Sequence, residues 1–556
     1  MKEFFSSIKI TRESFTPEVI RNLAVLLALI ITIAAPFVLR PAKAGYTRKP
    51  DQTLVILSPH NETIRAEISS AFYTYILNRD DQRVRLDWRT PGGTSEIEKF
   101  IDSSFRASFE NYWTKELGNT WSESDIGDAF NSRKVDPAGD SPGSKARRAF
   151  LDSNVGIGVD LFFGGGEYPF VVQAEKGNLV DSGIFERRSE WFTDDIIPAE
   201  VSGERFYDPD HRWVGNCLSS FGIVYNVDSL ARLGIENPPA QWSDLGDPRL
   251  FRQVALADPT KSGSATKAFE MLIQQKMHEA ALNLKRKDFE TEEEFVDRAV
   301  RRGWIDGLNL IQSISANARY FTDSSAKIPL DVAQGNAAAG MCIDFYGRTM
   351  NELLRKPDGT SRVLYFTPLG GSSFSVDPFG VFRGAPQPEL ALDFMEFLLS
   401  EEGQKIWNNK AGTPGGPERR SLRRLPVRKD IYTEENLVHF ADPEEFPYET
   451  AVQFQYVRDW TSPAFDAIRF ILRCMVLDAH EELQEAWQVL IENDFPPDAT
   501  RTFYSVGFVD YDKSLGYISD RLKSGYKPSE VTLARQLTNQ FRSNYRRAIR
   551  MAERGQ

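Results

Sequence analysis

Three short apolar runs each end in a turn rich in Gly, Ser or Pro, and each turn leads into a segment with helical spacing. The runs are LVILSPHNETIRAEI from Leu54, VDLFFGGGEYPFVV from Val159 and VALADPTKSGSATKAFEML from Val254. Continuous runs of Val, Ile, Leu and Phe are typical of strands buried on both faces of a parallel sheet. In open α/β sheets, the loops at the carboxyl ends of such strands bind ligands. The pattern therefore predicts an α/β protein with several ligand-facing loops.

Length and composition limit the alternatives. A chain of 556 residues predicts two to four domains, at a usual ~100–200 residues each. The formal net charge of −12 excludes a general basic surface for nucleic acid, so we expect no nucleic-acid partner. The three cysteines, Cys217, Cys342 and Cys474, are too few and too widely spaced for a Cys-based zinc site or a disulfide scaffold. We expect three buried free thiols rather than one bridge.

An uncharged apolar segment, LAVLLALIITIAAPFVL, occupies residues 23–39. At about 1.5 Å per residue it is just long enough to cross a bilayer core as a helix. One interpretation is an uncleaved transmembrane anchor that follows a short cytoplasmic segment, 1–22. The other is a signal peptide cleaved near Ala44, where Ala-Lys-Ala fits the small-x-small rule. Both place the rest of the chain on the periplasmic or extracellular face.

Complete catalytic motifs are missing from the sequence. There is no G-x-x-x-x-G-K-[ST] phosphate loop, and the Gly156-Ile157-Gly158 segment lacks the third Gly of a dinucleotide fingerprint. His480-Glu481 has no second His four residues on, and no G-x-S-x-G elbow is present. We therefore predict that the protein is not an enzyme and uses no cofactor.

The strongest local indication of binding is the segment ADPTKSGSAT, residues 257–266. Hydroxyl groups and a Gly stand between a strand end and a helix start, where free N–H groups and the helix dipole favour an anion or a polar oxygen. Ordinary capping of the helix by Ser262 or Ser264 explains the same residues equally well.

Two further loops have the same character. Ser58, His60 and Asn61 follow the first predicted strand, where Ser58 and Asn61 are also natural helix caps. Asp344 and Tyr346 follow a strand of small residues, and their oxygens suit either a hard cation or a polar ligand. A structural tyrosine with a bonded hydroxyl is the alternative for Tyr346. Glycines at 92–93 and 164–166 permit close approach of the backbone to a ligand, although tight turns explain them equally well.

The order of these motifs resembles that of bacterial extracellular solute-binding proteins of ABC importers, of the iron(III)/phosphonate/polyamine type. The resemblance covers roughly residues 54–417 and rests on SPHNE, GGTSE, VDLFFGGG, FGIVYN, ADPTKSGSA, GMCIDFYG and DPFGVFRGAPQPELALDFMEFLLSEEGQKIW. It implies an α/β, two-lobe type II periplasmic-binding-protein fold with hinge strands. Such proteins close around a small-molecule ligand and present both lobes to a membrane permease.

The resemblance also implies the domain organisation. The fold would be preceded by one apolar helix and followed by a helical tail. The predicted segments are lobe 1 at 54–212 with an insertion at 106–145, lobe 2 at 213–369 with an insertion at 284–302, a return to lobe 1 at 370–432, and a helical tail at 433–556. The hinge is predicted near 222–225 and 367–371.

By residue-by-residue correspondence, the resemblance implies nine ligand contacts: Ser58, His60, Asn61, Thr94, Ser262, Gly263, Ser264, Asp344 and Tyr346. Iron-binding members of the family usually offer two adjacent tyrosines, whereas Phe345-Tyr346 supplies one phenol. Ferric iron prefers several hard anionic oxygens, so the sequence favours an organic anion. If the ligand is iron, His60, Asp344 and Tyr346 are the expected metal ligands, and no other metal site is predicted.

The expected partners are the small-molecule ligand, an ABC permease and its ATPase, together with the membrane if residues 23–39 are retained. An alternative hypothesis is a membrane-anchored sensory domain that signals through a partner. The apolar segment and the helical tail motivate this alternative.

Overall fold

The computed structural model describes residues 24–32, 50–524 and 526–556. It divides into two units, 1–51 and 52–556. In the first unit, residues 24–32 are helical; residues 1–22, the rest of the predicted apolar segment 23–39, and the predicted cleavage site at Ala44 lie outside the described residues. Within the described ranges, no helix combines the length and the apolar character that crossing a membrane requires. The anchor therefore stays a prediction.

A mixed sheet begins the second unit, with strand order β14-β7-β13-β3-β1-β2 and β4 paired with β13. Its strands are β1 (Gln52–Leu57), β2 (Val84–Arg89), β3 (Leu161–Phe163), β4 (Leu179–Val180), β7 (Val214–Ser219), β13 (Ser375–Phe382) and β14 (Leu425–Pro426). β1 is parallel to β2 and β3, as the runs at Leu54 and Val159 predict. β13 runs antiparallel to β3 and β7, because the chain returns to this sheet from the opposite direction.

A second mixed sheet has the order β10-β9-β11-β8-β12. Its strands are β8 (Phe221–Asn226), β9 (Val254–Ala257), β10 (Ala318–Thr322), β11 (Ala339–Ile343) and β12 (Val363–Phe366). β9 is parallel to β10 and β11, whereas β8 is antiparallel to β11 and β12. We call residues 52–219 and 375–432 the first-sheet module and residues 221–366 the second-sheet module.

The chain passes between the two modules at Ser220 and again over 367–374. The second passage contains the predicted hinge segment 367–371. The first lies just before the predicted segment 222–225, which is part of β8. β7 and β8 are both buried throughout, so the local pattern does not mark where one sheet gives way to the other. β7 belongs to the first sheet although it lies beyond the predicted lobe boundary at 212.

The helices of the first-sheet module pack around its sheet. The main ones are α2 (Glu62–Asp80), α3 (Thr94–Asn111), α4 (Pro142–Asp152), α5 (Glu167–Lys176), α12 (Pro388–Leu399) and α13 (Glu401–Asn408). α2 is capped by Asn61, which accepts from the Ile64 N–H, and it buries Ile64, Ile68, Phe72 and Ile76, the face that the i, i+4 spacing predicts. In the predicted insertion at 106–145, the rings of Phe109 and Phe130 stack with centroids 4.7 Å apart.

Five helices belong to the second-sheet module: α7 (Val227–Arg232), α8 (Gly263–Asn283), α9 (Glu292–Ala316), α10 (Ile328–Ala333) and α11 (Asp344–Leu353). The predicted insertion at 284–302 supplies the first turns of α9. Thr291 and Glu294 form a reciprocal capping box there, which explains why so charged a segment starts a helix.

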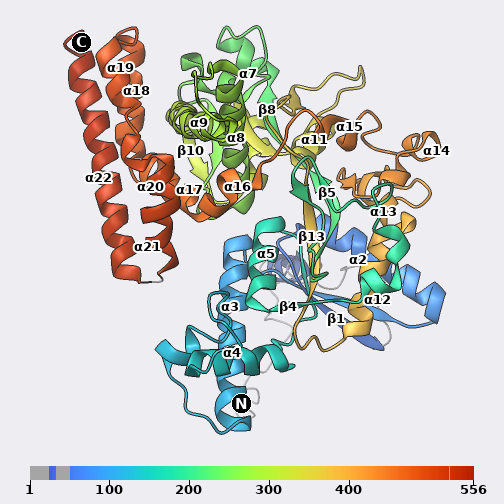
Figure 1. The fold of residues 1–556 in the computed structure, drawn as a ribbon. Coiled ribbons are helices and arrows are strands. Elements are labelled where there is room, and N and C mark those ends of the chain that lie inside the picture. Colours follow the sequence, from blue (N-terminus) through green and yellow to red (C-terminus); the bar gives the residue numbers. More distant parts are fainter. Residues whose placement is uncertain (1–23, 33–49, 525) are drawn as a thin grey trace, which may run out of the picture. The chain divides into compact units, whose positions relative to one another are not determined.

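The predicted helical tail is confirmed, but it divides between the two cores. Ala451 packs in the core of the first-sheet module, whereas residues from Phe454 onward pack in the core of the second. We call residues 454–556 the C-terminal helical region. It contains α16 (Arg458–Thr461), α17 (Phe465–Leu472), α18 (His480–Glu492), α19 (Pro497–Phe503), α20 (Tyr511–Lys513), α21 (Ser519–Lys523) and α22 (Lys527–Ala552). α18 lies against both α9 and α22 (Figure 1).

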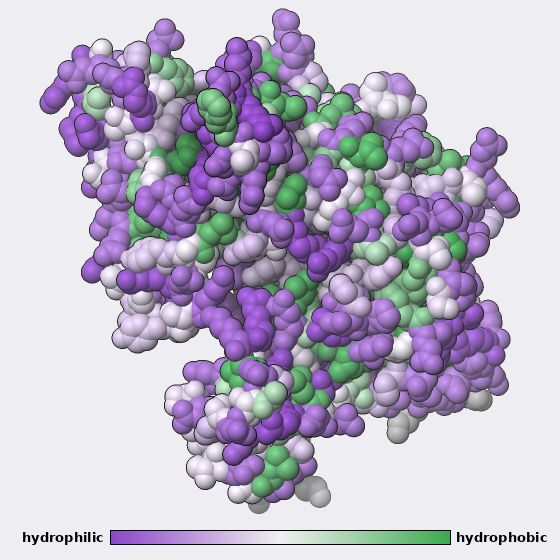
Figure 2. Space-filling model, in the orientation of Figure 1, coloured by the Kyte–Doolittle hydropathy of each residue, from purple (hydrophilic) through white to green (hydrophobic). Residues whose placement is uncertain are grey.

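Apolar side chains are mostly inside these cores. Cys217, Cys342 and Cys474 are buried and free, as predicted. The visible face is mainly hydrophilic, with small separate hydrophobic patches (Figure 2). This distribution is typical of a folded protein whose apolar residues are used in packing.

Candidate ligand-binding site

A cavity of about 630 Å³, which we call the cleft, is lined by loops from both modules. Six of the nine predicted contact residues line it: His60, Thr94, Ser262, Gly263, Ser264 and Tyr346. They come from the loop after β1, from the N-termini of α3 and α8, and from the first turn of α11. The structure thus brings together loops that follow strands of two different sheets.

The N-termini of α3 and α8 face each other across the cleft. A Cβ built on Gly263 would lie 3.9 Å from the Cβ of Thr94, and one on Gly93 would lie 3.3 Å from the Lys261 carbonyl oxygen. α3 has no side-chain cap, and the Ser262 hydroxyl of α8 accepts only from the Ala265 N–H. Two elements of opposite modules therefore approach closely at this point.

Four backbone N–H groups at these two N-termini have no hydrogen-bond acceptor among the described residues. They belong to Thr94, Ser95, Gly263 and Ser264. Free N–H groups and the positive end of the helix dipole together favour an anion or a polar oxygen. The arrangement suits a ligand that accepts hydrogen bonds from both modules at once.

A third helix N-terminus at the cleft, that of α5, already has an anion. One carboxylate oxygen of Asp377 accepts from the N–H groups of Gly165 at 2.7 Å and Gly166 at 3.2 Å. The other accepts from Arg424 at 2.7 Å and lies 3.0 Å from His60 Nε2. Burial alone would raise the pKa of Asp377, but the Arg424 charge and the His60 hydrogen bond outweigh it and hold that pKa far below its usual range.

Ser58, His60 and Asp377 form a hydrogen-bonded chain that resembles a hydrolase triad in composition. Ser58 Oγ lies 3.0 Å from His60 Nδ1 and also accepts from the His60 N–H at 3.1 Å. Ser58 is completely buried and does not line the cleft, so its hydroxyl has no access to a substrate. Burial lowers the pKa of His60, which keeps the ring neutral. These hydrogen bonds thus hold His60 and Asp377 in place at the cleft wall.

Asp344 and Asn61, two other predicted contacts, are occupied elsewhere. The Asp344 carboxylate accepts from Arg348 at 2.6 Å and from the Phe345 N–H at 2.8 Å, fully buried. Asn61 caps α2. Neither residue lines the cleft, because each serves the helix that it begins.

The residues at the cleft are poorly suited to bind ferric iron. Burial raises the pKa of Tyr346, which opposes the phenolate that iron requires. Among the described residues, no group of three or more His, Cys, Asp or Glu side chains is arranged to hold a metal ion.

Arg424 is a cleft residue that the sequence analysis missed. Its guanidinium stacks over Phe345 at 4.7 Å and donates to Ser219 at 2.6 Å, while its Nε has no hydrogen-bond partner among the described residues. The sequence offers only the basic run RRSLRR at 419–424, in which no spacing distinguishes Arg424 from the other arginines, and Arg423 is buried as well.

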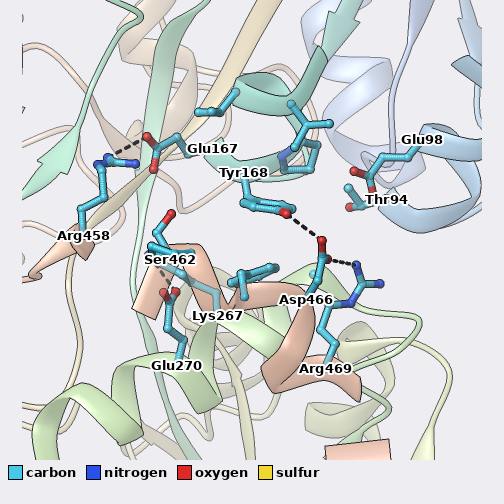
Figure 3. Close-up of a pocket in the computed structure, with 18 of the residues that line it drawn as sticks. Thr94, Glu98, Glu167, Tyr168, Lys267, Glu270, Arg458, Ser462, Asp466 and Arg469 are labelled. Carbon is cyan, nitrogen blue, oxygen red and sulfur yellow. Dashed lines mark hydrogen bonds and ion pairs between the residues drawn. The ribbon is translucent and has the colours of Figure 1, made fainter. Parts of the chain in front are cut away.

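A second cavity of about 400 Å³, which we call the side chamber, adjoins the cleft. Both cavities are lined by Thr94, Gly165, Gly166, Phe221, Gly263, Ser264 and Ser375. Helices α3 and α5, α8, and α16 with α17 of the C-terminal helical region form the remaining walls (Figure 3). No sequence motif predicts this chamber.

Polar contacts join the C-terminal helical region to the first-sheet module around the side chamber. Arg458 donates to Glu167 at 2.8 Å, and Tyr168 donates to Asp466 at 3.0 Å (Figure 3). Arg469 donates to Ser95 Oγ at 2.7 Å. These contacts place the C-terminal helical region beside α3 and α5.

Comparison with known proteins is consistent with a binding function. Residues 169–429 match the family model for a bacterial extracellular solute-binding protein. An uncharacterized protein of Haemophilus influenzae is 27% identical over 253 residues, 45% of this chain and 60% of that protein. The phosphoglycerate transport regulatory protein PgtC of Salmonella typhimurium is 27% identical over 193 residues, 35% of this chain and 40% of PgtC. The chain thus matches less than two thirds of the length of either relative.

Solved structures of periplasmic binding proteins are also similar. The protein AfuA of Actinobacillus pleuropneumoniae, with fructose-6-phosphate bound, is 18% identical with a TM-score of 0.43, over 68% of this chain and 86% of AfuA. Iron-bound HitA of Pseudomonas aeruginosa is 14% identical with a TM-score of 0.43, over 75% of this chain and 98% of HitA. The predicted resemblance to bacterial extracellular solute-binding proteins is confirmed by the family match over residues 169–429.

Proposed function

We propose that the protein captures a small organic anion, of the phosphate-ester or phosphonate class, in the cleft for import by an ABC permease and its ATPase. The observation that carries this proposal is the pair of opposed helix N-termini, α3 from one module and α8 from the other. An anion between them accepts hydrogen bonds from both modules. Its binding therefore favours the closed arrangement over the open one.

In this proposal the two modules act as lobes that rotate about Ser220 and 367–374. Closure of two lobes around a ligand is a common hinge motion. The closed form then presents surfaces of both lobes to the permease, and the periplasmic or extracellular face is the corresponding location. Thr94, Ser262, Gly263, Ser264, His60 and Tyr346 are the proposed contacts, with Arg424 added.

An organic anion suits the cleft better than ferric iron. Asp344 is neutralised by Arg348, and Tyr346 is held as a neutral phenol by burial. The N-terminus of α5 is already neutralised by Asp377, so the ligand charge is directed to α3 and α8. The relative PgtC is named for phosphoglycerate transport, and phosphoglycerate is a phosphate ester.

The test is a thermal-shift and calorimetric screen with phosphate esters, phosphonates, polyamines and ferric citrate. We expect phosphate esters or phosphonates to raise the melting temperature. Ser264→Asp, which adds a negative charge at the N-terminus of α8, is expected to abolish their binding. Ser103→Asp, on the exposed side of α3, is the matched control and should leave it unchanged. Stabilisation by ferric citrate or a polyamine, with no response to the anions, would overturn the proposal.

A further inference from the structure

The side chamber lies next to the proposed anion position. Thr94 and Gly263, which carry two of the free N–H groups, line both cavities. A ligand whose charged group lies between α3 and α8 therefore has the side chamber beside it. At about 400 Å³ the chamber is large enough for more than a simple inorganic anion.

Most charged side chains of the side chamber already have partners. Arg458 pairs with Glu167, and Arg133 pairs with Glu175. Lys267 lies 3.2 Å from the Glu270 carboxylate and 3.0 Å from that of Glu204. Apolar and aromatic surface fills in between, where the rings of Tyr168 and Phe465 lie 4.5 Å apart. The chamber therefore suits an organic group that adds little charge overall.

Three charged lining residues lack a hydrogen bond or an ion pair among the described residues: the exposed Asp459 and Lys523, and the less exposed Glu98. The Glu98 carboxylate is therefore the more buried of the two acidic groups among them. It lies one helical turn after Thr94 on α3, so the two side chains lie along the same side of the chamber (Figure 3). The carboxylate of Glu98 thus remains available in a partly desolvated space.

The charged groups around Glu98 do not satisfy it. Arg469 and Lys176 favour its ionised form, whereas Asp466 and Asp102 oppose it. Arg469 donates instead to Ser95 Oγ and to backbone oxygens, and Lys176 pairs with Asp102 at 2.6 Å. Burial is the dominant influence and raises the pKa of Glu98 to about 7. A cation brought next to this carboxylate gains a partner that the protein itself does not supply.

We propose that the side chamber receives the organic part of the ligand, and that this part carries an amino or ammonium group that pairs with Glu98. The inference rests on the proposed function, which supplies the anionic end between α3 and α8. Four residues of α3 separate Thr94 from Glu98, a rise of about 6 Å. A spacer of two or three carbon atoms between the anionic and cationic groups covers this length. The ligand class is therefore a zwitterionic phosphate ester or phosphonate.

The experiment compares three probes that share a phosphate group: phosphorylcholine with a cationic tail, glycerol 3-phosphate with a neutral tail, and 3-phosphoglycerate with an anionic tail. Calorimetry at pH 8 is expected to show phosphorylcholine binding at least tenfold more tightly than the other two. Glu98→Gln should reduce phosphorylcholine affinity at least tenfold and leave glycerol 3-phosphate affinity unchanged. Glu110→Gln, on the exposed end of the same helix, is the control and should change neither.

The pH dependence provides a second readout. Lowering the pH from 8 to 6 protonates Glu98, so the preference for phosphorylcholine over glycerol 3-phosphate should shrink in the wild-type protein. The same preference should be small and independent of pH in Glu98→Gln. Taking the ratio of the two probes removes the titration of the phosphate group, which both share.

The outcomes separate the two proposals. Equal binding of the three probes, or tightest binding of 3-phosphoglycerate, overturns the role of Glu98 and leaves the anion position intact. If none of the probes and no inorganic phosphate stabilises the protein, the proposed function itself fails, and the inference fails with it. A Glu98→Gln variant that weakens all three probes alike also overturns the inference.

Discussion

The C-terminal helical region contacts the two modules in opposite ways. Against the second-sheet module it forms one apolar core, in which Phe541, Trp487 and Ile471 pack with Trp304. Against the first-sheet module it forms mainly polar pairs, such as Arg458 with Glu167. Apolar burial gains about 25 cal/mol per Å², whereas a typical hydrogen bond adds only about 0.5–1.5 kcal/mol, because water competes for both groups. The region is therefore a permanent part of one module and a releasable neighbour of the other.

This difference bears on opening of the cleft. If the modules rotate apart, the C-terminal helical region must travel with the second-sheet module and leave α3 and α5. The groups exposed by that separation are mostly charged or hydroxylated, and water can hydrate them. Substitutions on the apolar side should therefore unfold the protein, whereas those on the polar side should change the balance between open and closed forms.

The largest expected effect is on the apolar side. Phe541→Ala removes a fully buried ring from α22 and should lower the free energy of unfolding by about 3–5 kcal/mol. Chemical denaturation measures this loss, with the exposed neighbour Gln540→Ala as the control. A loss below about 1 kcal/mol would contradict the permanent attachment of this region.

A smaller effect is expected from the ion pair on the polar side. Arg458→Met leaves the nearly buried Glu167 carboxylate without its partner and should lower the free energy of unfolding by about 2–3 kcal/mol. Adding Glu167→Gln should recover most of this loss, because the uncompensated charge disappears. Small-angle scattering should show both variants more open than the wild type. A double variant as unstable as the single one, with no change in scattering, would mean that the contact is not releasable.

The pH dependence of stability offers a third test. The raised pKa of Glu98 means that the folded state favours its protonated form. The stability that the folded state gains from protonated Glu98 is therefore fully present below the ordinary Glu pKa of about 4.3. It is lost as the pH rises through about 7. Glu98→Gln should be about 3 kcal/mol more stable than the wild type at pH 8 and equal to it at pH 4. Parallel stability curves for the two proteins would show that the carboxylate is already solvated.

The smallest expected effect concerns one hydrogen bond. Tyr168→Phe removes the bond to Asp466 but keeps the ring against Phe465, so the loss should be about 0.5–1.5 kcal/mol. Tyr526→Phe changes an exposed tyrosine and serves as the control in the same denaturation experiment. If Tyr168→Phe lowered the free energy of unfolding as much as Phe541→Ala, the C-terminal helical region would be bound to both modules equally strongly.

Local features of the fold were predictable from the sequence. The apolar face of α2 repeats every three to four residues, and its cap lies directly before it, so neighbouring residues contain all the information. The salt bridge from Asp344 to Arg348 is also visible in the sequence as an i, i+4 pair. This spacing argues against the ligand role for Asp344 that the family resemblance implies.

Other parts of the site depend on contacts that no local pattern records. Asp377 meets His60 across 317 positions of sequence, and Arg424 reaches the same carboxylate from a third segment. Arg458 and Asp466 reach the side chamber from beyond the part of the chain that the family resemblance covers. Ser58 is a predicted ligand contact that the structure places in the core. A serine after a strand can face either the ligand or the core, and only the packing of the whole fold decides between them.

The order in which the strands are synthesised has a consequence for folding. All five strands of the second sheet come from one continuous stretch, 221–366, whereas β13, which lies between β7 and β3, follows it. At about 5–20 residues per second, some tens of seconds pass between the synthesis of β3 and that of β13. During this interval the apolar edge of β3, Leu-Phe-Phe, has no partner on one side. Because unpaired strand edges promote aggregation, this edge is where we expect the emerging chain to need a chaperone.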